Sequence, residues 1–196
     1  MLSTVLGVTA FLLYLLYDVN SFRWKRQLPR SFFLIGTLFL AAATVLDFID
    51  ALQSGTFSGM VDWILLLPAA ASLLLLVYCL FFAIPFEATY SEQTTGRQVC
   101  DRGAYALCRH PGILCFFLFF LFLGLAALPA RLLWNGLLFS LLNLAYAAFQ
   151  DRVTFPKTFS NYEAYKAQVP FLIPTPASIR AARRTFVHLH TKEDNS

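Results

Sequence analysis

The stretch Gly103-Ala-Tyr105-Ala-Leu-Cys-Arg109-His110-Pro111 decides how this chain is interpreted, because it is polar and cationic and opens directly into an apolar run from Gly112 to Leu128. A run of this length indicates a helix that crosses a membrane, since spanning the hydrocarbon core takes about 20 mostly apolar residues. Pro111 suits the first turn of such a helix, where its missing N–H leaves no bond unmade. The sequence therefore places an Arg-His pair at a membrane boundary.

The composition extends this interpretation to the whole chain. The 196 residues are 58% hydrophobic and 13% charged, with a mean hydropathy of +0.63. Soluble domains average about 25% charged residues, so we expect an integral membrane protein with a single domain, 1–196. The four cysteines form no Cys-x-x-Cys pair and the three histidines are scattered, which predicts free thiols and no metal site.

Five segments are long and apolar enough to be helices that cross the membrane. They are 2–19, 31–51, 61–86, 111–129 and 132–149. The fold class predicted is all-α: a polytopic membrane protein with about five transmembrane helices and a cytosolic C-terminal helical segment. Pro68 predicts a kink or tilt in the third helix.

Charge orients these helices. All but one of the fifteen Lys and Arg residues fall in the first and third loops or after the fifth helix, and the exception is Arg131. The positive-inside rule makes the basic face cytoplasmic, which puts the N-terminus outside and the C-terminus inside. Asp47, Asp50 and Asp62 gather on the outer side with Arg131. Met1 leads into apolar sequence without a basic region or cleavage site, so we expect a retained first helix, and the net charge of +4 carries no nucleic-acid signal.

The chain changes character after residue 149. Residues 150–176 are mixed polar and aromatic, and Phe159, Tyr162 and Tyr165 share one face of a short predicted helix. Residues 177–196 form a basic amphipathic tail, which sets Arg180, Arg183 and Arg184 against an apolar face of Ile179, Ala182, Phe186 and Leu189. This pattern is typical of a helix that lies on an anionic membrane surface.

Two polar clusters are expected at the inner ends of the last two helices. The first is Tyr105, Arg109 and His110, and the second is Gln150, Asp151 and Arg152. A very short turn joins these helices, so we expect them to be antiparallel neighbours with their inner ends together.

Each of these residues also has a purely structural interpretation. Arg109 can anchor its helix by snorkelling, and His110 can cap a helix. Asp151 and Arg152 can form a weak surface ion pair, while Asn143 can bond between helices. The aromatic stripe can serve packing alone.

The order of these residues resembles a known pattern. Gly103-x-Tyr105-x-x-x-Arg109-His110-Pro111 is similar to the G-x-Y-x-x-x-R-H-P motif of the integral-membrane methyltransferases, a superfamily that includes isoprenylcysteine carboxyl methyltransferases and phospholipid N-methyltransferases. The same family has a second motif further along its sequence, F-G-x-x-Y-x-x-Y-x-x-x-V-P-x-x-I-P. The stretch from Phe159 to Pro174 of this chain resembles that motif. The resemblance covers residues 90–176. The chain departs from the family at Ile113 and Cys115, where x-Tyr-x-Gly is usual, and at Gln150-Asp151, where a Glu-Glu pair is usual.

The resemblance implies S-adenosylmethionine as methyl donor and a lipidic or hydrophobic acceptor, either an isoprenylcysteine-like carboxylate or a lipid amine. The cofactor-binding residues implied are Tyr105, Arg109, His110, Pro111, Gln150, Asp151, Tyr162 and Tyr165, and the catalytic ones are Asp151, Arg152 and His110. An arginine, Arg109 or Arg152, would bind the donor carboxylate, and Asp151 with Gln150 the ammonium. His110 would bond the carboxylate or ribose, and the tyrosines would contact adenine or the sulfonium.

Two other functions fit the same sequence. The departures at Ile113, Cys115 and Gln150 favour a membrane scaffold or subunit that keeps the fold without the chemistry. A nicotinamide-dependent membrane reductase of the same broad fold group is the second alternative, although no Gly-rich dinucleotide fingerprint is present. Donor binding separates these alternatives from the methyltransferase.

Overall fold

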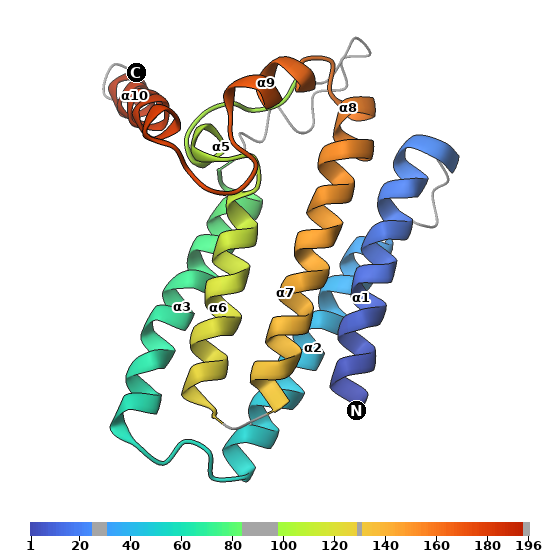
Figure 1. The fold of residues 1–196 in the computed structure, drawn as a ribbon, viewed down its shortest axis with the longest axis vertical. Coiled ribbons are helices and arrows are strands. Elements are labelled where there is room, and N and C mark those ends of the chain that lie inside the picture. Colours follow the sequence, from blue (N-terminus) through green and yellow to red (C-terminus); the bar gives the residue numbers. More distant parts are fainter. Residues whose placement is uncertain (25–30, 84–97, 129–130, 194–196) are drawn as a thin grey trace. The chain divides into compact units, whose positions relative to one another are not determined.

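The computed structural model describes residues 1–24, 31–83, 98–128 and 131–193, and every regular element within these ranges is a helix (Figure 1). The elements are α1 (Leu2–Val19), the π-helical turn η1 (Asn20–Trp24), α2 (Phe32–Gln53), α3 (Met60–Phe81), α5 (Ala104–Leu107), α6 (Pro111–Ala126), α7 (Arg131–Phe149), the π-helical turn η3 (Gln150–Thr154), α8 (Phe155–Thr158), α9 (Tyr162–Gln168) and α10 (Pro176–Glu193).

The predicted fold class, an all-α polytopic membrane protein, is confirmed. Four helical segments are long and apolar enough to cross a membrane: Leu2–Arg23, Phe32–Gln53, Met60–Phe81 and Arg131–Thr158. The fifth, α6, is apolar but has only 16 residues, which spans about 24 Å at 1.5 Å per residue. The direction in which the chain crosses the membrane stays a prediction.

Two predicted helix ends were too late. The third helix ends at Phe81 instead of 86, because the N–H of Ala83 bonds the Tyr78 carbonyl five residues back and closes the helix. The fourth helix ends at Ala126 instead of 129, where the N–H of Ala127 bonds the Gly124 carbonyl in a turn. Residues 84–86 and 129 lie outside the described ranges, as do Lys25, Arg26, Arg30 and Arg97 of the charged loops.

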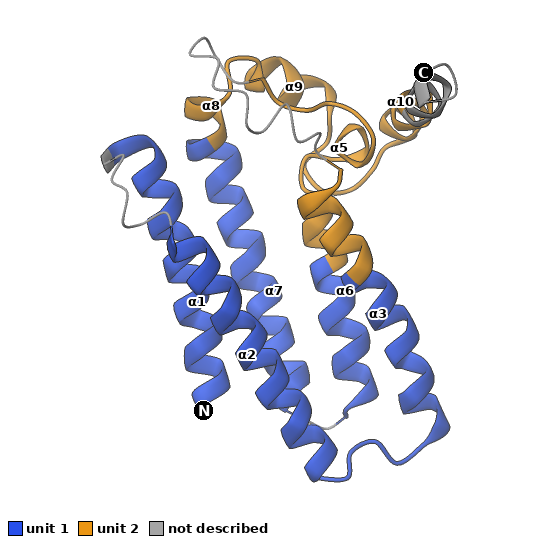
Figure 2. Ribbon diagram, turned by 180° about the vertical axis from the view of Figure 1, so that it is seen from behind, with its two compact units in different colours: residues 1–73, 116–154 blue, residues 74–115, 155–196 orange. Residues whose placement is uncertain are grey.

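The chain divides into two compact units, which are described separately (Figure 2). Unit 1 comprises Met1–Leu73 and Phe116–Thr154, and unit 2 comprises Leu74–Cys115 and Phe155–Ser196. In unit 1, α1 packs along α2 and α7. Small residues allow this close approach: Ala10 and Ala43 are fully buried, and a side-chain carbon added at Gly7 would collide with the ring of Phe139.

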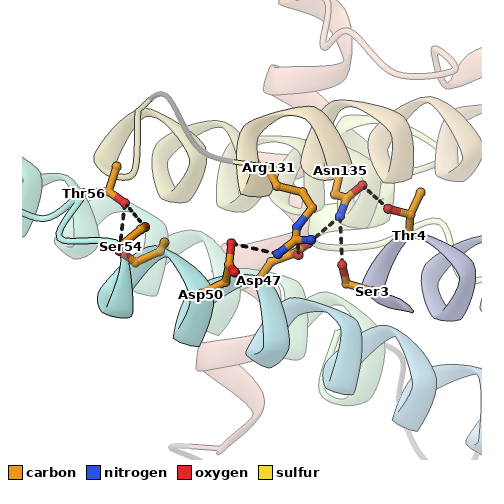
Figure 3. Close-up of polar contacts among 9 residues, drawn as sticks. Ser3, Thr4, Asp47, Asp50, Ser54, Thr56, Arg131 and Asn135 are labelled. Atoms are coloured by element: carbon orange, nitrogen blue, oxygen red, sulfur yellow. Dashed lines mark hydrogen bonds and ion pairs between the residues drawn. The ribbon is translucent and has the colours of Figure 1, made fainter. Parts of the chain in front are cut away.

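A buried polar network joins α1, α2 and α7 inside unit 1 (Figure 3). Asn135 donates to Oδ2 of Asp47 at 2.6 Å and to the Ser3 hydroxyl at 3.3 Å, and Thr4 donates to Oδ1 of Asn135 at 2.9 Å. Asp47 is only 3% exposed. Its other oxygen lies 3.2 Å from Nε of Arg131, which also pairs with Asp50 at 2.8 Å. Asp47, Asp50 and Arg131, which the sequence grouped on one side, thus pair with one another, whereas Asp62, the third acid of that group, accepts from the N–H groups of Ser58 and Gly59.

Replacing Asp47 by Ala should lower the unfolding temperature in detergent more than replacing Asp50. The Asp47 substitution leaves the buried amide of Asn135 and one side of Arg131 without their acceptor, a loss of about 1–3 kcal/mol. The carboxylate of Asp50 is half exposed, and an exposed ion pair contributes about 0–1 kcal/mol. Equal shifts for the two variants, measured by intrinsic fluorescence, would contradict this ranking.

Candidate functional site

The motif stretch lies in unit 2 and begins at a backbone position that requires glycine. Gly103 has φ 58° and ψ −128°, and its N–H donates to the Thr185 hydroxyl of α10 at 3.1 Å. The single turn of α5 follows, and then Cys108 is extended, with φ −157° and ψ 161°. Helix α6 begins at Pro111, at the position expected from the sequence.

Arg109 joins the motif stretch to α9. Its NH1 nitrogen donates to the carbonyls of Lys166 at 3.0 Å and Val169 at 2.7 Å. Its backbone N–H donates to the Pro170 carbonyl at 2.9 Å, and its guanidinium carbon lies 5.6 Å from the centre of the Phe171 ring. These carbonyls stand at the C-terminal end of α9, where a cation is electrostatically favoured. Part of the guanidinium therefore stabilises the fold of unit 2.

His110 is enclosed by aromatic rings. It is 8% exposed, its ring is nearly parallel to Phe155 at 5.7 Å, and Phe171 lies 5.0 Å away. Its backbone N–H donates to the Phe171 carbonyl at 3.2 Å. The imidazole is thus held in a fixed orientation by packing.

The tyrosines of both halves of the resemblance contact one another within unit 2. Tyr162 and Tyr165 are 1% and 6% exposed and form an apolar cluster with Val169. The Tyr165 hydroxyl donates to the Tyr105 carbonyl at 2.7 Å, and the Tyr105 hydroxyl donates to the Cys79 carbonyl at 2.9 Å. The packing interpretation of the aromatic stripe thus describes these rings, and their contact with a donor stays a prediction.

Burial also favours the neutral form of the tyrosine and cysteine side chains around this cluster. Burial raises the pKa of both Tyr105 and Tyr165 well above the ordinary tyrosine value. It raises the pKa of the Cys108 thiol to about 11, which favours the protonated thiol at neutral pH. All four cysteines are free thiols.

Helix α10 packs against α5 within unit 2. Ser178 and Ala182 are buried and the Thr185 hydroxyl accepts from Gly103, whereas Ile179 is 42% exposed. The residues of α10 that face α5 are therefore small or polar, and such residues allow the two helices to lie close together. The side chains of Phe186 and Leu189, predicted to share an apolar face with Ile179 and Ala182, lie outside the described residues, so the position of this helix on a membrane surface stays a prediction. Arg180, Arg183 and Arg184 are exposed.

The second predicted cluster lies in unit 1, on the π-helical turn η3. Gln150 donates from its amide to the Tyr146 hydroxyl at 3.0 Å. Asp151 is 5% exposed, whereas Arg152 is exposed. Turns of this kind are rare and occur often at functional sites. The predicted surface ion pair of Asp151 with Arg152 does not describe a carboxylate that is this deeply buried.

The sequence interpretation missed Asp18, which lies beside this turn in unit 1. Asp18 is 4% exposed, and the Thr154 hydroxyl donates to its Oδ2 at 3.4 Å. Its carboxylate also bonds the side chains of Gln150 and Tyr146. A single acid inside an otherwise apolar segment is itself a signal of function, and Asp18 carried that signal within the predicted helix 2–19.

The predicted site residues thus fall into two sets. Unit 2 brings together Tyr105, Arg109, His110, Pro111, Tyr162 and Tyr165, and unit 1 holds Gln150, Asp151 and Arg152. The convergence of the two sets at one site stays a prediction. No protein-family model, no curated protein and no solved structure matches this chain. The fold defines the class, a polytopic helical membrane protein, and the function is argued from the residues.

Replacing Gly103 by Ala should destabilise the motif stretch. A side chain in this backbone conformation costs about 1–3 kcal/mol, and the strain falls at the start of α5. Gly112 is the matched control, because an added carbon there would lie 3.5 Å from Leu76, an ordinary contact, inside a helix that prefers Ala to Gly. Protease susceptibility near residue 103 should rise in the first variant only; the same rise in both would contradict the strain at Gly103.

Proposed function

We propose that this protein is an integral-membrane methyltransferase that transfers a methyl group from S-adenosylmethionine to a lipidic or hydrophobic acceptor. The proposal is supported by one observation above all. The two stretches that carry the family resemblance, 103–111 and 159–174, are about sixty residues apart in the sequence yet are bonded to each other through Arg109, His110 and Tyr165. A chance match of two separate motifs would not require them to fold together.

The residues present suit the chemical groups of the donor. S-adenosylmethionine carries a carboxylate, an ammonium and an adenosine on a sulfonium that supplies the electrophilic methyl. The buried carboxylate of Asp151 suits the ammonium, with the Gln150 amide oxygen beside it. Because NH1 of Arg109 already bonds two backbone carbonyls, the exposed Arg152 is the stronger candidate for the donor carboxylate. The fixed ring of His110 remains the candidate for the ribose.

The chain's contribution to such a reaction is mainly positioning. An in-line displacement gains about 7–11 kcal/mol from fixed alignment of the reacting groups, and the enclosed His110 and buried Asp151 are suited to fixed geometry. A carboxylate acceptor needs no base. An amine acceptor must lose a proton, and Asp151 or His110 would receive it. A hydrocarbon tail on the acceptor would lie among the apolar helices.

A second candidate, a non-catalytic membrane scaffold, is favoured by a different observation. Arg109, Tyr105 and Tyr165 all direct bonds to backbone carbonyls within unit 2. A motif that holds its own fold together can persist after chemistry is lost. Donor binding separates the two candidates, because a scaffold has no requirement for S-adenosylmethionine.

Titration of S-adenosylmethionine into the purified protein in detergent should give saturable heat. NADPH should not displace the donor, which separates this function from the reductase alternative. Asp151→Asn should weaken donor binding and lower the rate of methyl transfer to a membrane lipid extract by at least about tenfold, the effect of removing one charge-assisted bond.

Asp50→Asn provides the control, since this carboxylate pairs with Arg131 instead, and both its donor affinity and its transfer rate should match those of the wild type. Arg109→Ala is a poor test because it also removes the bonds to α9. Absence of heat at millimolar donor would contradict the methyltransferase and favour the scaffold. Wild-type transfer rates in Asp151→Asn would show that Asp151 is not part of the site.

A further inference from the structure

Asp18 is a buried acid near the end of α1, inside a segment that is long and apolar enough to cross a membrane. Only 4% of it is exposed. An ionisable side chain in such a segment is costly and is retained where it meets a partner or a ligand. The contacts of Asp18 therefore indicate what it is for.

Two of its three contacts lead to a single element, η3, and the third leads to the last turns of α7. Among the residues that the structure describes, the Asp18 carboxylate bonds the hydroxyl of Thr154, the amide of Gln150 and the hydroxyl of Tyr146. Thr154 and Gln150 are the two ends of η3, and Asp151 lies between them on the same turn. These three partners are uncharged, so they satisfy the Asp18 carboxyl group by hydrogen bonds alone.

Asp18 and Asp151 place two buried carboxyl groups beside one turn. Asp18 comes from α1, 136 residues before Thr154, yet its carboxylate bonds the side chain of Gln150. Asp151 lies on η3 itself, and it is 5% exposed. Among the described residues, η3 thus carries one buried acid and bonds a second.

We infer that Asp18 is the second carboxylate of the donor site and binds the ammonium of the amino-acid group of S-adenosylmethionine together with Asp151. This inference rests on the proposed function. A primary ammonium has three N–H donors and no acceptor, so it is satisfied by carboxylates and amide oxygens such as those of Asp18, Asp151 and Gln150. Bonds of this kind between ionised groups are about twice as strong as neutral ones.

Tyr146 and Thr154 act as positioning residues in this arrangement. Tyr146 accepts from the Gln150 amide at 3.0 Å and also bonds Asp18, so it fixes both side chains. Its ring stacks on Tyr14 of α1 at 5.7 Å. The carboxylate of Asp18 is thereby held in one place before any ligand arrives, which reduces the ordering cost of binding.

The test compares donor affinity in three variants by calorimetry in detergent. Asp18→Asn removes the charge and keeps the size, so the dissociation constant of S-adenosylmethionine should rise about tenfold to a hundredfold. Asp18→Asn combined with Gln150→Glu moves a carboxylate to the neighbouring side chain and should restore most of the affinity. Asp47→Asn changes an equally buried acid in the Asn135 network and should leave the affinity unchanged.

A donor analogue in which a ketone replaces the amine tests the partner group directly. The wild type should prefer S-adenosylmethionine over this deaminated analogue, and Asp18→Asn should lose most of that preference. Thermal unfolding of each variant shows whether it is folded. A folded Asp18→Asn protein with wild-type affinity, or with the wild-type preference intact, would overturn the role of Asp18 alone. Absence of donor binding to the wild type would instead overturn the proposed function.

Discussion

A polar group withdrawn from water must find its partner inside the protein, and this constraint explains most of the specific contacts in both units. Arg109, just before α6, satisfies this requirement by donating hydrogen bonds to carbonyls at the C-terminal end of α9. The buried carboxylate of Asp47 satisfies the same requirement by bonding Asn135 and pairing with Arg131. The apolar faces of the membrane helices have no comparable selectivity, because lipid tails and leucine side chains are equally acceptable neighbours. Polar pairs therefore decide which helix sides pack together.

The helices of this fold could be predicted from hydropathy, whereas their partners could not. Apolar length located all five predicted segments, and the missing N–H of Pro111 marked the start of α6. The errors fell at Phe81 and Ala126, where single backbone bonds close a helix. Hydropathy also did not predict that Asp18 bonds Thr154 or that Gly103 bonds Thr185. Such pairs depend on which side chains meet in three dimensions. The periodicity of the local sequence carries no information about these long-range contacts.

The candidate site shows the same division between what the sequence reveals and what it does not. The motif residues were identifiable by type and spacing, and unit 2 brings six of them together. Their present bonds were not foreseeable: the hydroxyls of Tyr105 and Tyr165 and NH1 of Arg109 all bond backbone carbonyls. Three of the residues that the resemblance names thus hold unit 2 together through these bonds. In unit 1, the buried carboxyl groups of Asp18 and Asp151 lie at η3.

We propose that stretches 103–111 and 159–174 of unit 2 form one donor-binding structure. Hydrogen–deuterium exchange of the protein in detergent, with and without saturating S-adenosylmethionine, tests it most directly. Slower amide exchange is expected in both stretches when the donor is present, with no change at the Asp47 end of unit 1. Unchanged exchange everywhere, or slowing confined to only one of these stretches, would contradict it.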